Sequence, residues 1–129
     1  MSAQVLIVED APINMKLATL LLRREGYQVL QAGTADEGIE LAREHLPGLI
    51  LMDIQLPGMD GLEATQILKR DIRTASIPVV ALTAFAMEGD EDRILAAGCD
   101  GYLTKPIRYL AFLSEVRRAL PLEEPPDVN

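Results

Sequence analysis

The sequence is poor in the residues on which thiol chemistry and membrane insertion depend. It contains a single cysteine, Cys99, which excludes an internal disulfide and a CxxC metal site. Its longest uncharged stretch, residues 74–87, is interrupted by Pro78 and is shorter than the roughly 20 apolar residues that span a bilayer. The first residues lack the basic segment of a signal peptide. We therefore expect a protein of the reduced cytoplasm, without a membrane segment.

Positive charge is also scarce. Twelve lysines and arginines stand against 20 aspartates and glutamates, for a formal net charge of −8. Because a nucleic-acid-binding domain needs a basic face that displaces counterions, we expect no nucleic-acid partner.

Apolar residues make up 49% of the chain, which allows a hydrophobic core and excludes intrinsic disorder of its body. A chain of 129 residues is expected to form one domain.

Short apolar runs alternate with helical patterns along the chain. Residues 5–8, 49–52 and 79–82 are continuous apolar runs, which are typical of parallel strands covered on both faces. The segments 27–31 and 102–104 are more polar or shorter, which favours edge strands. Helices are predicted after Pro12, Thr34 and Asp60, and before Gly98 and Pro121.

These helices carry capping signals and apolar stripes. Gly26 is expected to end the first helix in a left-handed conformation, and Thr34 with Glu37 forms a predicted capping box. We expect a core to bury the stripes of the first and last helices. The stripes comprise Leu17, Leu20 and Leu21 in the first helix and Leu110, Leu113, Val116 and Leu120 in the last.

Five strands that alternate with five helices predict an α/β fold with an open, doubly wound parallel sheet. Right-handed crossovers favour the strand order 2-1-3-4-5, as in flavodoxin-like folds. We expect the domain over residues 1–120 and a flexible, proline-rich tail over residues 121–129. Because the tail is too short for an output domain, we expect the module to stand alone.

Polar side chains follow four of the five predicted strands. Glu9 and Asp10 end the first apolar run, Asp53 the third strand, Thr83 the fourth and Lys105 the fifth. Taken singly, an acidic residue there is usually a helix cap and a lysine a solvated charge. Ligands of open parallel sheets, however, bind outside the carboxyl ends of the strands, near the switch in strand order. We therefore expect these five side chains to converge on one site.

The charges of this set predict a divalent cation. The three carboxylates contribute −3 and Lys105 contributes +1, which leaves −2, and a cation compensates their mutual repulsion. Oxygen ligands without histidine or cysteine select a hard ion such as Mg²⁺. A metal beside a carboxylate and a lysine is suited to phosphoryl transfer. Asp53 is then the predicted nucleophile, which forms an aspartyl phosphate.

These residues and their surroundings resemble the receiver domains of two-component response regulators, the CheY-like family. The resemblance spans the chain except its tail and is carried by VLIVED at 5–10, LMDIQLPGMDG at 51–61, PVVALTA at 78–84 and Lys105-Pro106. Segments at 14–17 and 83–91 are similar to single-domain regulators of cell division. Glu9 stands where many family members have aspartate, a departure that concerns the geometry of the site rather than its function.

The resemblance implies how the acidic residues act. Asp53 would accept a phosphoryl group from the phosphohistidine of a sensor histidine kinase or a histidine phosphotransfer protein. Glu9, Asp10, Asp53 and the backbone carbonyl of Gln55 would hold Mg²⁺. The chain would thus promote its own phosphorylation and dephosphorylation and would not be an enzyme that acts on other substrates.

The resemblance also implies a switch. Lys105 would pair with the phosphoryl oxygens, and its peptide bond to Pro106 would be cis. Thr83 would move to hydrogen-bond the phosphate, and Tyr102 would rotate inward. The face formed by the fourth helix, the fifth strand and the fifth helix would then bind a downstream protein. We expect a monomer or a weak dimer.

Two other classes of protein share parts of this pattern. Phosphatases of the haloacid dehalogenase type also use an aspartyl phosphate with lysine and Mg²⁺, but they typically carry a second aspartate two positions after the nucleophile, where this chain has Gln55. Flavodoxins share the predicted topology, but their first loop binds the phosphate of FMN, which Glu9 and Asp10 would repel. A third alternative is an interaction module that is never phosphorylated; the intact set of acceptor residues argues against it.

Overall fold

Five parallel strands form one sheet, in the order β2-β1-β3-β4-β5, in the computed structural model, which describes residues 3–84 and 89–122. The strands are β1 (Gln4–Val8), β2 (Gln28–Ala32), β3 (Leu49–Asp53), β4 (Val79–Thr83) and β5 (Gly101–Thr104). The helices of this part of the chain are α1 (Pro12–Arg24), α2 (Ala35–His45), α3 (Gly61–Arg70), α4 (Asp90–Ala96) and α5 (Tyr109–Ala119). The predicted order 2-1-3-4-5 is confirmed, with β2 and β5 at the edges.

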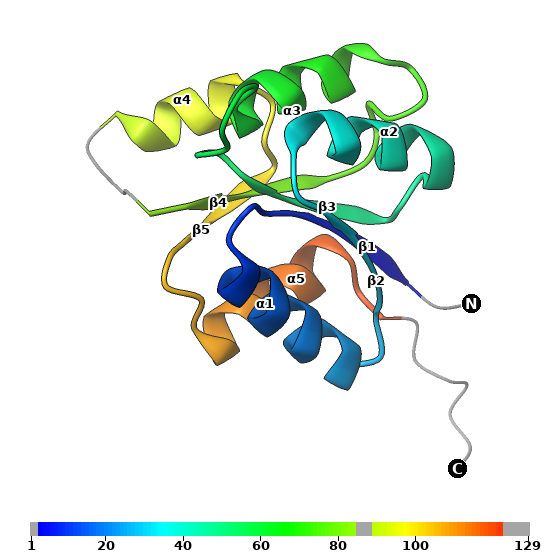
Figure 1. The fold of residues 1–129 in the computed structure, drawn as a ribbon, viewed down its shortest axis with the longest axis vertical. Helices are drawn as coiled ribbons and strands as arrows, with labels where there is room; N and C mark the ends of the chain where they lie inside the picture. Colours follow the sequence, from blue (N-terminus) through cyan, green and yellow to red (C-terminus); the bar gives the residue numbers. More distant parts are fainter. Residues whose placement is uncertain (1–2, 85–88, 123–129) are drawn as a thin grey trace.

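The helices lie in two layers, one on each face of the sheet (Figure 1). α1 and α5 cover one face, and α2, α3 and α4 cover the other. The predicted doubly wound α/β fold is therefore confirmed. Of the helices described, none combines the length and the apolar character that crossing a membrane requires.

Alternate residues of the central strands point into the two layers. Leu6 and Ile50 belong to the core beneath α2, α3 and α4, whereas Ile7 and Leu51 belong to the core beneath α1 and α5. Every residue of β3 and β4 is buried. The apolar runs are continuous because neither face of these strands meets water.

The ends of the helices follow the predicted signals. Gly26 has φ +98° after α1, the left-handed conformation that glycine adopts without a steric penalty. At the start of α2, Thr34 Oγ1 accepts a hydrogen bond from the Glu37 amide at 3.2 Å. The Glu37 carboxylate reaches back and accepts one at 2.7 Å from the amide of Gly33. The capping box is thus confirmed.

The predicted apolar stripes are wrong at three positions. Leu17, Leu20 and Leu110 are 37%, 54% and 76% exposed. α1 instead buries Leu21 and the neighbouring residues Ala18 and Leu22. The reason is that a helix on the face of a sheet buries only one side, and packing against the sheet sets its rotation about its axis. Leu17 and Leu20 therefore lie on the outer side of α1.

The chain beyond α5 is described only to Leu122, which packs against the core beneath α1 and α5. The Tyr27 hydroxyl donates a hydrogen bond to the Leu120 carbonyl at 2.7 Å and links this segment to the turn between α1 and β2. The predicted tail over residues 121–129 lies outside the described residues from 123 onward, so the domain boundary at residue 120 stays a prediction.

Candidate functional site

The register of the sheet brings the predicted residues to one edge. Val8 of β1 pairs with Met52 of β3. The residues that follow them, Glu9 and Asp53, therefore lie next to each other at the ends of these two strands. Thr83 of β4 pairs with Thr104 of β5, and Lys105 comes directly after it. Parallel pairing alone therefore places residues from four strands at the same end of the sheet.

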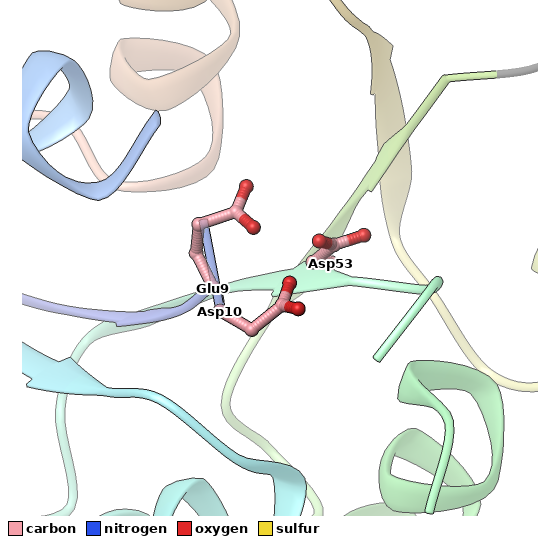
Figure 2. Close-up of side chains that lie close together, drawn as sticks. All are labelled: Glu9, Asp10 and Asp53. Carbon is pink, nitrogen blue, oxygen red and sulfur yellow. The ribbon is translucent and has the colours of Figure 1, made fainter. Parts of the chain in front are cut away.

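Three carboxylates gather at this end. Glu9, Asp10 and Asp53 each offer one oxygen within 4.8 Å of the others, and Figure 2 shows the three side chains close together at the ends of β1 and β3. Glu9 and Asp53 are 3% and 1% exposed, whereas Asp10 is exposed. The cluster thus has two buried carboxylates and one that is exposed to solvent.

Lys105 neutralises part of this charge. Its Nζ donates a hydrogen bond to Asp53 Oδ2 at 2.9 Å and lies 3.0 Å from Glu9 Oε1. The Lys105 amide donates to the Thr83 carbonyl at 2.7 Å, and the bond between Lys105 and Pro106 is cis. The backbone that continues from β5 past β4 therefore directs the lysine side chain toward the carboxylates.

The backbone around each buried carboxylate also fixes its orientation. The Gln55 amide donates to Asp53 Oδ1 at 2.9 Å, so both oxygens of Asp53 are held. The Ala11 amide donates to Glu9 Oε2 at 3.1 Å. The sequence analysis did not identify these amides, because a backbone donor leaves no signal in the residue type.

Burial and charge shift the proton affinities at the site. Burial raises the pKa of Glu9, and the neighbouring Asp53 raises it further, against the opposing effects of the Ala11 amide and Lys105. For Lys105, burial lowers the pKa, but the hydrogen bond to Asp53 and the negative charges of Asp53 and Glu9 outweigh it and raise the pKa above its ordinary value. The lysine is therefore held in its charged form.

The donor set fits a hard divalent cation. Three carboxylates and one ammonium group leave a charge of −2 in a largely buried site. Glu9 Oε1 is buried and accepts no hydrogen bond from the residues described; its ion-pair neighbour is Lys105. Oxygen ligands, one of them exposed, suit an ion that keeps part of its water shell.

The two predicted switch residues lie beside this site on β4 and β5. Thr83 ends β4 and is 1% exposed. Tyr102 pairs with Ala81, two residues before Thr83, and packs against the core beneath α2, α3 and α4. The charge of Glu91 on α4 raises the pKa of Tyr102, with smaller contributions from burial and from a hydrogen bond to Glu91. Tyr102 therefore lies close to Glu91 of α4.

The sequence matches a known family over most of its length. The response regulator receiver domain family matches residues 5–117. The polar-differentiation response regulators DivK of Brucella ovis and Brucella anthropi are each 48% identical over 120 residues, which cover 93% of this chain and 98% of theirs. The matched residues include the whole candidate site.

Solved structures share the fold of this chain. The chemotaxis protein CheY4 of Vibrio cholerae aligns with a TM-score of 0.88 at 25% identity, over 93% of this chain and 100% of that chain. The receiver domain of a sensor histidine kinase from Pseudomonas aeruginosa aligns with a TM-score of 0.84 at 32% identity, over 92% and 97%. That receiver domain holds a magnesium ion in its active-site cleft.

Proposed function

Since the chain belongs to the response regulator receiver domain family, we propose that Asp53 accepts a phosphoryl group from a phosphohistidine and that this modification switches the binding preference of the domain. The observation that carries the proposal is the Asp53 carboxylate itself, which is buried, oriented by the Gln55 amide and paired with Lys105 at 2.9 Å. A carboxylate held in this way presents a fixed oxygen to an incoming phosphorus atom.

The transfer is a displacement at phosphorus. One carboxylate oxygen of Asp53 forms a bond to phosphorus while the phosphorus–nitrogen bond of the donor breaks, and the leaving imidazole keeps the electron pair of that bond. Lys105, already next to the acceptor, pairs with the phosphoryl oxygens as their charge redistributes. Hydrolysis of the acyl phosphate returns the Asp53 carboxylate and releases inorganic phosphate, so the signal decays.

The acidic cluster is the proposed site for Mg²⁺. Glu9, Asp10, Asp53 and the backbone carbonyl of Gln55 would hold the ion, and their oxygen donors and net charge support this assignment. When bound, Mg²⁺ supplies positive charge that lets an anionic phosphate approach an anionic carboxylate. The magnesium in the similar Pseudomonas aeruginosa receiver domain lends further support.

Phosphorylation replaces one negative charge at Asp53 with about two, and the proposed switch responds to that change. Thr83 would hydrogen-bond the phosphoryl group, and Tyr102 would turn toward the space that Thr83 leaves. Tyr102 lies on β5, which contacts α4 and α5, and Thr83 lies on the neighbouring strand β4, so the face of α4, β5 and α5 would change its partner preference.

The proposed partners are a sensor histidine kinase or a histidine phosphotransfer protein upstream and a protein target downstream. Because the DivK proteins of Brucella are named for polar differentiation, we propose a role in the control of cell polarity and division. We also propose that the domain works in the cytoplasm as a monomer or weak dimer, and that residues 1–120 form the domain.

The direct test is phosphorylation with a small donor. Acetyl phosphate with Mg²⁺ is expected to add one phosphoryl group, detected by intact-protein mass spectrometry and removed by hydroxylamine, which cleaves acyl phosphates. Asp53→Asn is expected to abolish the addition, whereas Asp36→Asn, an exposed aspartate on α2, is the matched control. Addition of phosphate to the Asp53→Asn variant would contradict the assignment.

The alternatives predict different outcomes. A phosphatase of the haloacid dehalogenase type would turn over phosphate monoesters, and a flavodoxin would bind FMN and be yellow. We expect neither, because the family match spans residues 5–117 and the loop after β1 carries two carboxylates where a flavin phosphate would have to bind.

A further inference from the structure

The connection between β3 and α3 brings the helix unusually close to the proposed acceptor. The α-carbon of Gly61, the first residue of α3, lies against the backbone of Asp53. A methyl group at position 61 would lie 2.2 Å from the Asp53 carbonyl oxygen and 2.8 Å from both the Asp53 carbonyl carbon and the Ile54 α-carbon. Every one of these neighbours is backbone, which cannot turn away as a side chain can.

The first turn of α3 is held firmly in this place. The Gly61 amide donates a hydrogen bond to the Ile54 carbonyl at 3.3 Å. The hydroxyl of Thr65, which is fully buried, donates to the Gly61 carbonyl at 2.8 Å. Asp60 caps the helix by accepting a hydrogen bond from the Glu63 amide at 2.8 Å. The helix start is therefore a fixed support beneath the end of β3.

We infer that Gly61 is a positioning residue for phosphoryl transfer: its bare α-carbon lets α3 support the Asp53 backbone, and this support sets where the carboxylate lies relative to Lys105. The inference rests on the proposed function of Asp53. A side chain at position 61 must push the Asp53 carbonyl away, and the carboxylate moves with it out of its contacts with Lys105 Nζ and the Gln55 amide, both at 2.9 Å.

The expected size of the effect follows from this geometry. The backbone must yield by roughly 1 Å, and a misplacement of that size at a reacting group costs about 100-fold in rate. We expect Gly61→Ala to slow phosphorylation by acetyl phosphate and Mg²⁺ by at least about tenfold.

Gly48→Ala is the matched control. Gly48 directly precedes β3 at its other end, and a methyl group there would meet the Leu120 side chain at 2.8 Å. Both variants therefore add one methyl group in a tight space beside the same strand, but only Gly61→Ala presses on the acceptor. We expect Gly48→Ala to lose stability and to keep the rate of the unsubstituted protein.

A spectroscopic measurement separates position from stability. The chemical shift of the Gln55 amide, read by NMR in the folded protein, reports its hydrogen bond to Asp53 Oδ1. We expect it to shift in Gly61→Ala and to stay in Gly48→Ala. A variant that is merely less stable would leave the native signal where it is.

A second pair of variants applies if Gly61→Ala does not fold. Thr65→Val removes the hydroxyl that holds the Gly61 carbonyl, and Thr74→Val removes a buried hydroxyl that donates to the Leu68 carbonyl at 2.6 Å, at the other end of α3. The two changes are chemically identical. We expect Thr65→Val to slow phosphorylation several-fold more than Thr74→Val does.

The outcomes distinguish this inference from the function on which it rests. If the unsubstituted protein takes up no phosphate, the proposed function fails. If it is phosphorylated and a folded Gly61→Ala reacts at the same rate, or no more slowly than Gly48→Ala, the inference is overturned. Equal rates for Thr65→Val and Thr74→Val would overturn it as well.

Discussion

Lys105 shows how a single residue can serve both stability and chemistry. Its ammonium group lies between two buried carboxylates, 3.0 Å from Glu9 Oε1 and 2.9 Å from Asp53 Oδ2. A buried charge whose partner is removed still carries the cost of its desolvation but no longer gains the attraction of the opposite charge. The contacts that hold the Asp53 carboxylate in place therefore also offset the energetic cost of burying two negative charges.

Lys105→Met is expected to destabilise the protein in the absence of divalent cations by about 2–3 kcal/mol, since it leaves two buried carboxylates without their cation. Added Mg²⁺ should restore more stability in this variant than in the unsubstituted protein, because the site becomes more negative. Urea unfolding with EDTA and with Mg²⁺ measures both effects. Lys16→Met, at an exposed position, is the control, and equal responses of the two variants would contradict the assigned ion pairs.

Cys99 illustrates a residue whose environment suppresses its chemistry. It is 6% exposed, and its sulfur lies 3.9 Å from the hydroxyl of Thr65. Burial raises the pKa of the thiol, and this effect outweighs the opposing effect of the Thr65 contact. We expect a thiol reagent such as DTNB to label the native protein at least about tenfold more slowly than the protein in urea. Comparable rates in the two states would mean that Cys99 is accessible.

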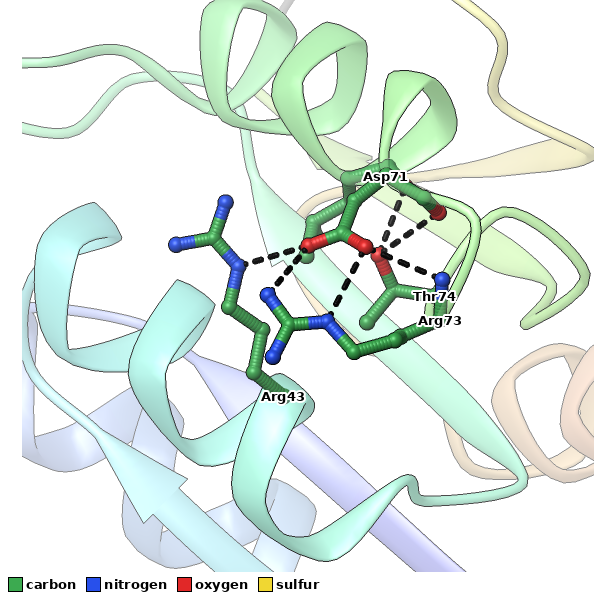
Figure 3. Close-up of polar contacts among 5 residues, drawn as sticks. Arg43, Asp71, Arg73 and Thr74 are labelled. Carbon is green, nitrogen blue, oxygen red and sulfur yellow. Dashed lines mark hydrogen bonds and ion pairs between the residues drawn. The ribbon is translucent and has the colours of Figure 1, made fainter.

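At the scale of elements, a polar cluster joins α2 to the loop after α3 (Figure 3). Arg43 Nε on α2 lies 2.8 Å from Asp71 Oδ2, and Arg73 Nη2 lies 3.0 Å from the same oxygen. The Arg73 amide also donates to Asp71 Oδ1 at 2.9 Å. Asp71 thus connects two helices that cover the same face of the sheet.

The same cluster makes stability depend on pH. The hydrogen bonds from Arg73 and then from Arg43 hold the pKa of Asp71 well below its ordinary value of 3.8. A carboxylate with a depressed native pKa stabilises the fold fully above its ordinary pKa, and this contribution is lost as the pH falls toward the depressed value. We therefore expect Asp71→Asn to be less stable than the unsubstituted protein at pH 7.

The difference in the free energy of unfolding between Asp71→Asn and the unsubstituted protein is expected to shrink below about pH 4, the ordinary pKa of an aspartate. Urea unfolding at several pH values measures it. Asp92→Asn, an exposed position on α4, is the control. A difference for Asp71→Asn that stays constant down to pH 3 would contradict the ion pairs in Figure 3.

The elements also show how far the sequence predicts this structure. The strands were predictable, because burial on both faces leaves continuous apolar runs such as residues 49–52. The convergence of Asp53 and Lys105 was predictable too, because parallel strands end at one edge. The exposed face of α1 was not, since the rotation that exposes Leu17 and Leu20 depends on packing against the sheet. The contact of Gly61 with Asp53 depends on the path of the loop between them, which residue types alone do not give.

At the scale of the whole molecule, negative charge is a general feature rather than a local one. The net charge is −8, and this total includes the acidic cluster, in which two of the three carboxylates are buried. A cation that binds the folded chain and not the unfolded one stabilises the fold in proportion to the logarithm of its concentration. On the proposed function, folding, Mg²⁺ binding and phosphorylation would therefore be linked through the same three carboxylates.

The proposed Mg²⁺ site leads to a prediction for the stability of the whole chain. Above the dissociation constant, each tenfold rise in Mg²⁺ concentration is expected to add about 1.4 kcal/mol to the free energy of unfolding. Asp10→Ala removes the exposed carboxylate of the proposed Mg²⁺ site and should shift this response to higher Mg²⁺ concentrations. The stability of this variant without the ion should stay the same or rise, because repulsion falls. Asp36→Ala, at an exposed position on α2 that is not one of the three clustered carboxylates, should respond like the unsubstituted protein. Thermal or urea unfolding over a Mg²⁺ series at constant ionic strength separates the site from general screening. An unchanged response in Asp10→Ala would mean that the cluster in Figure 2 is not where the ion acts.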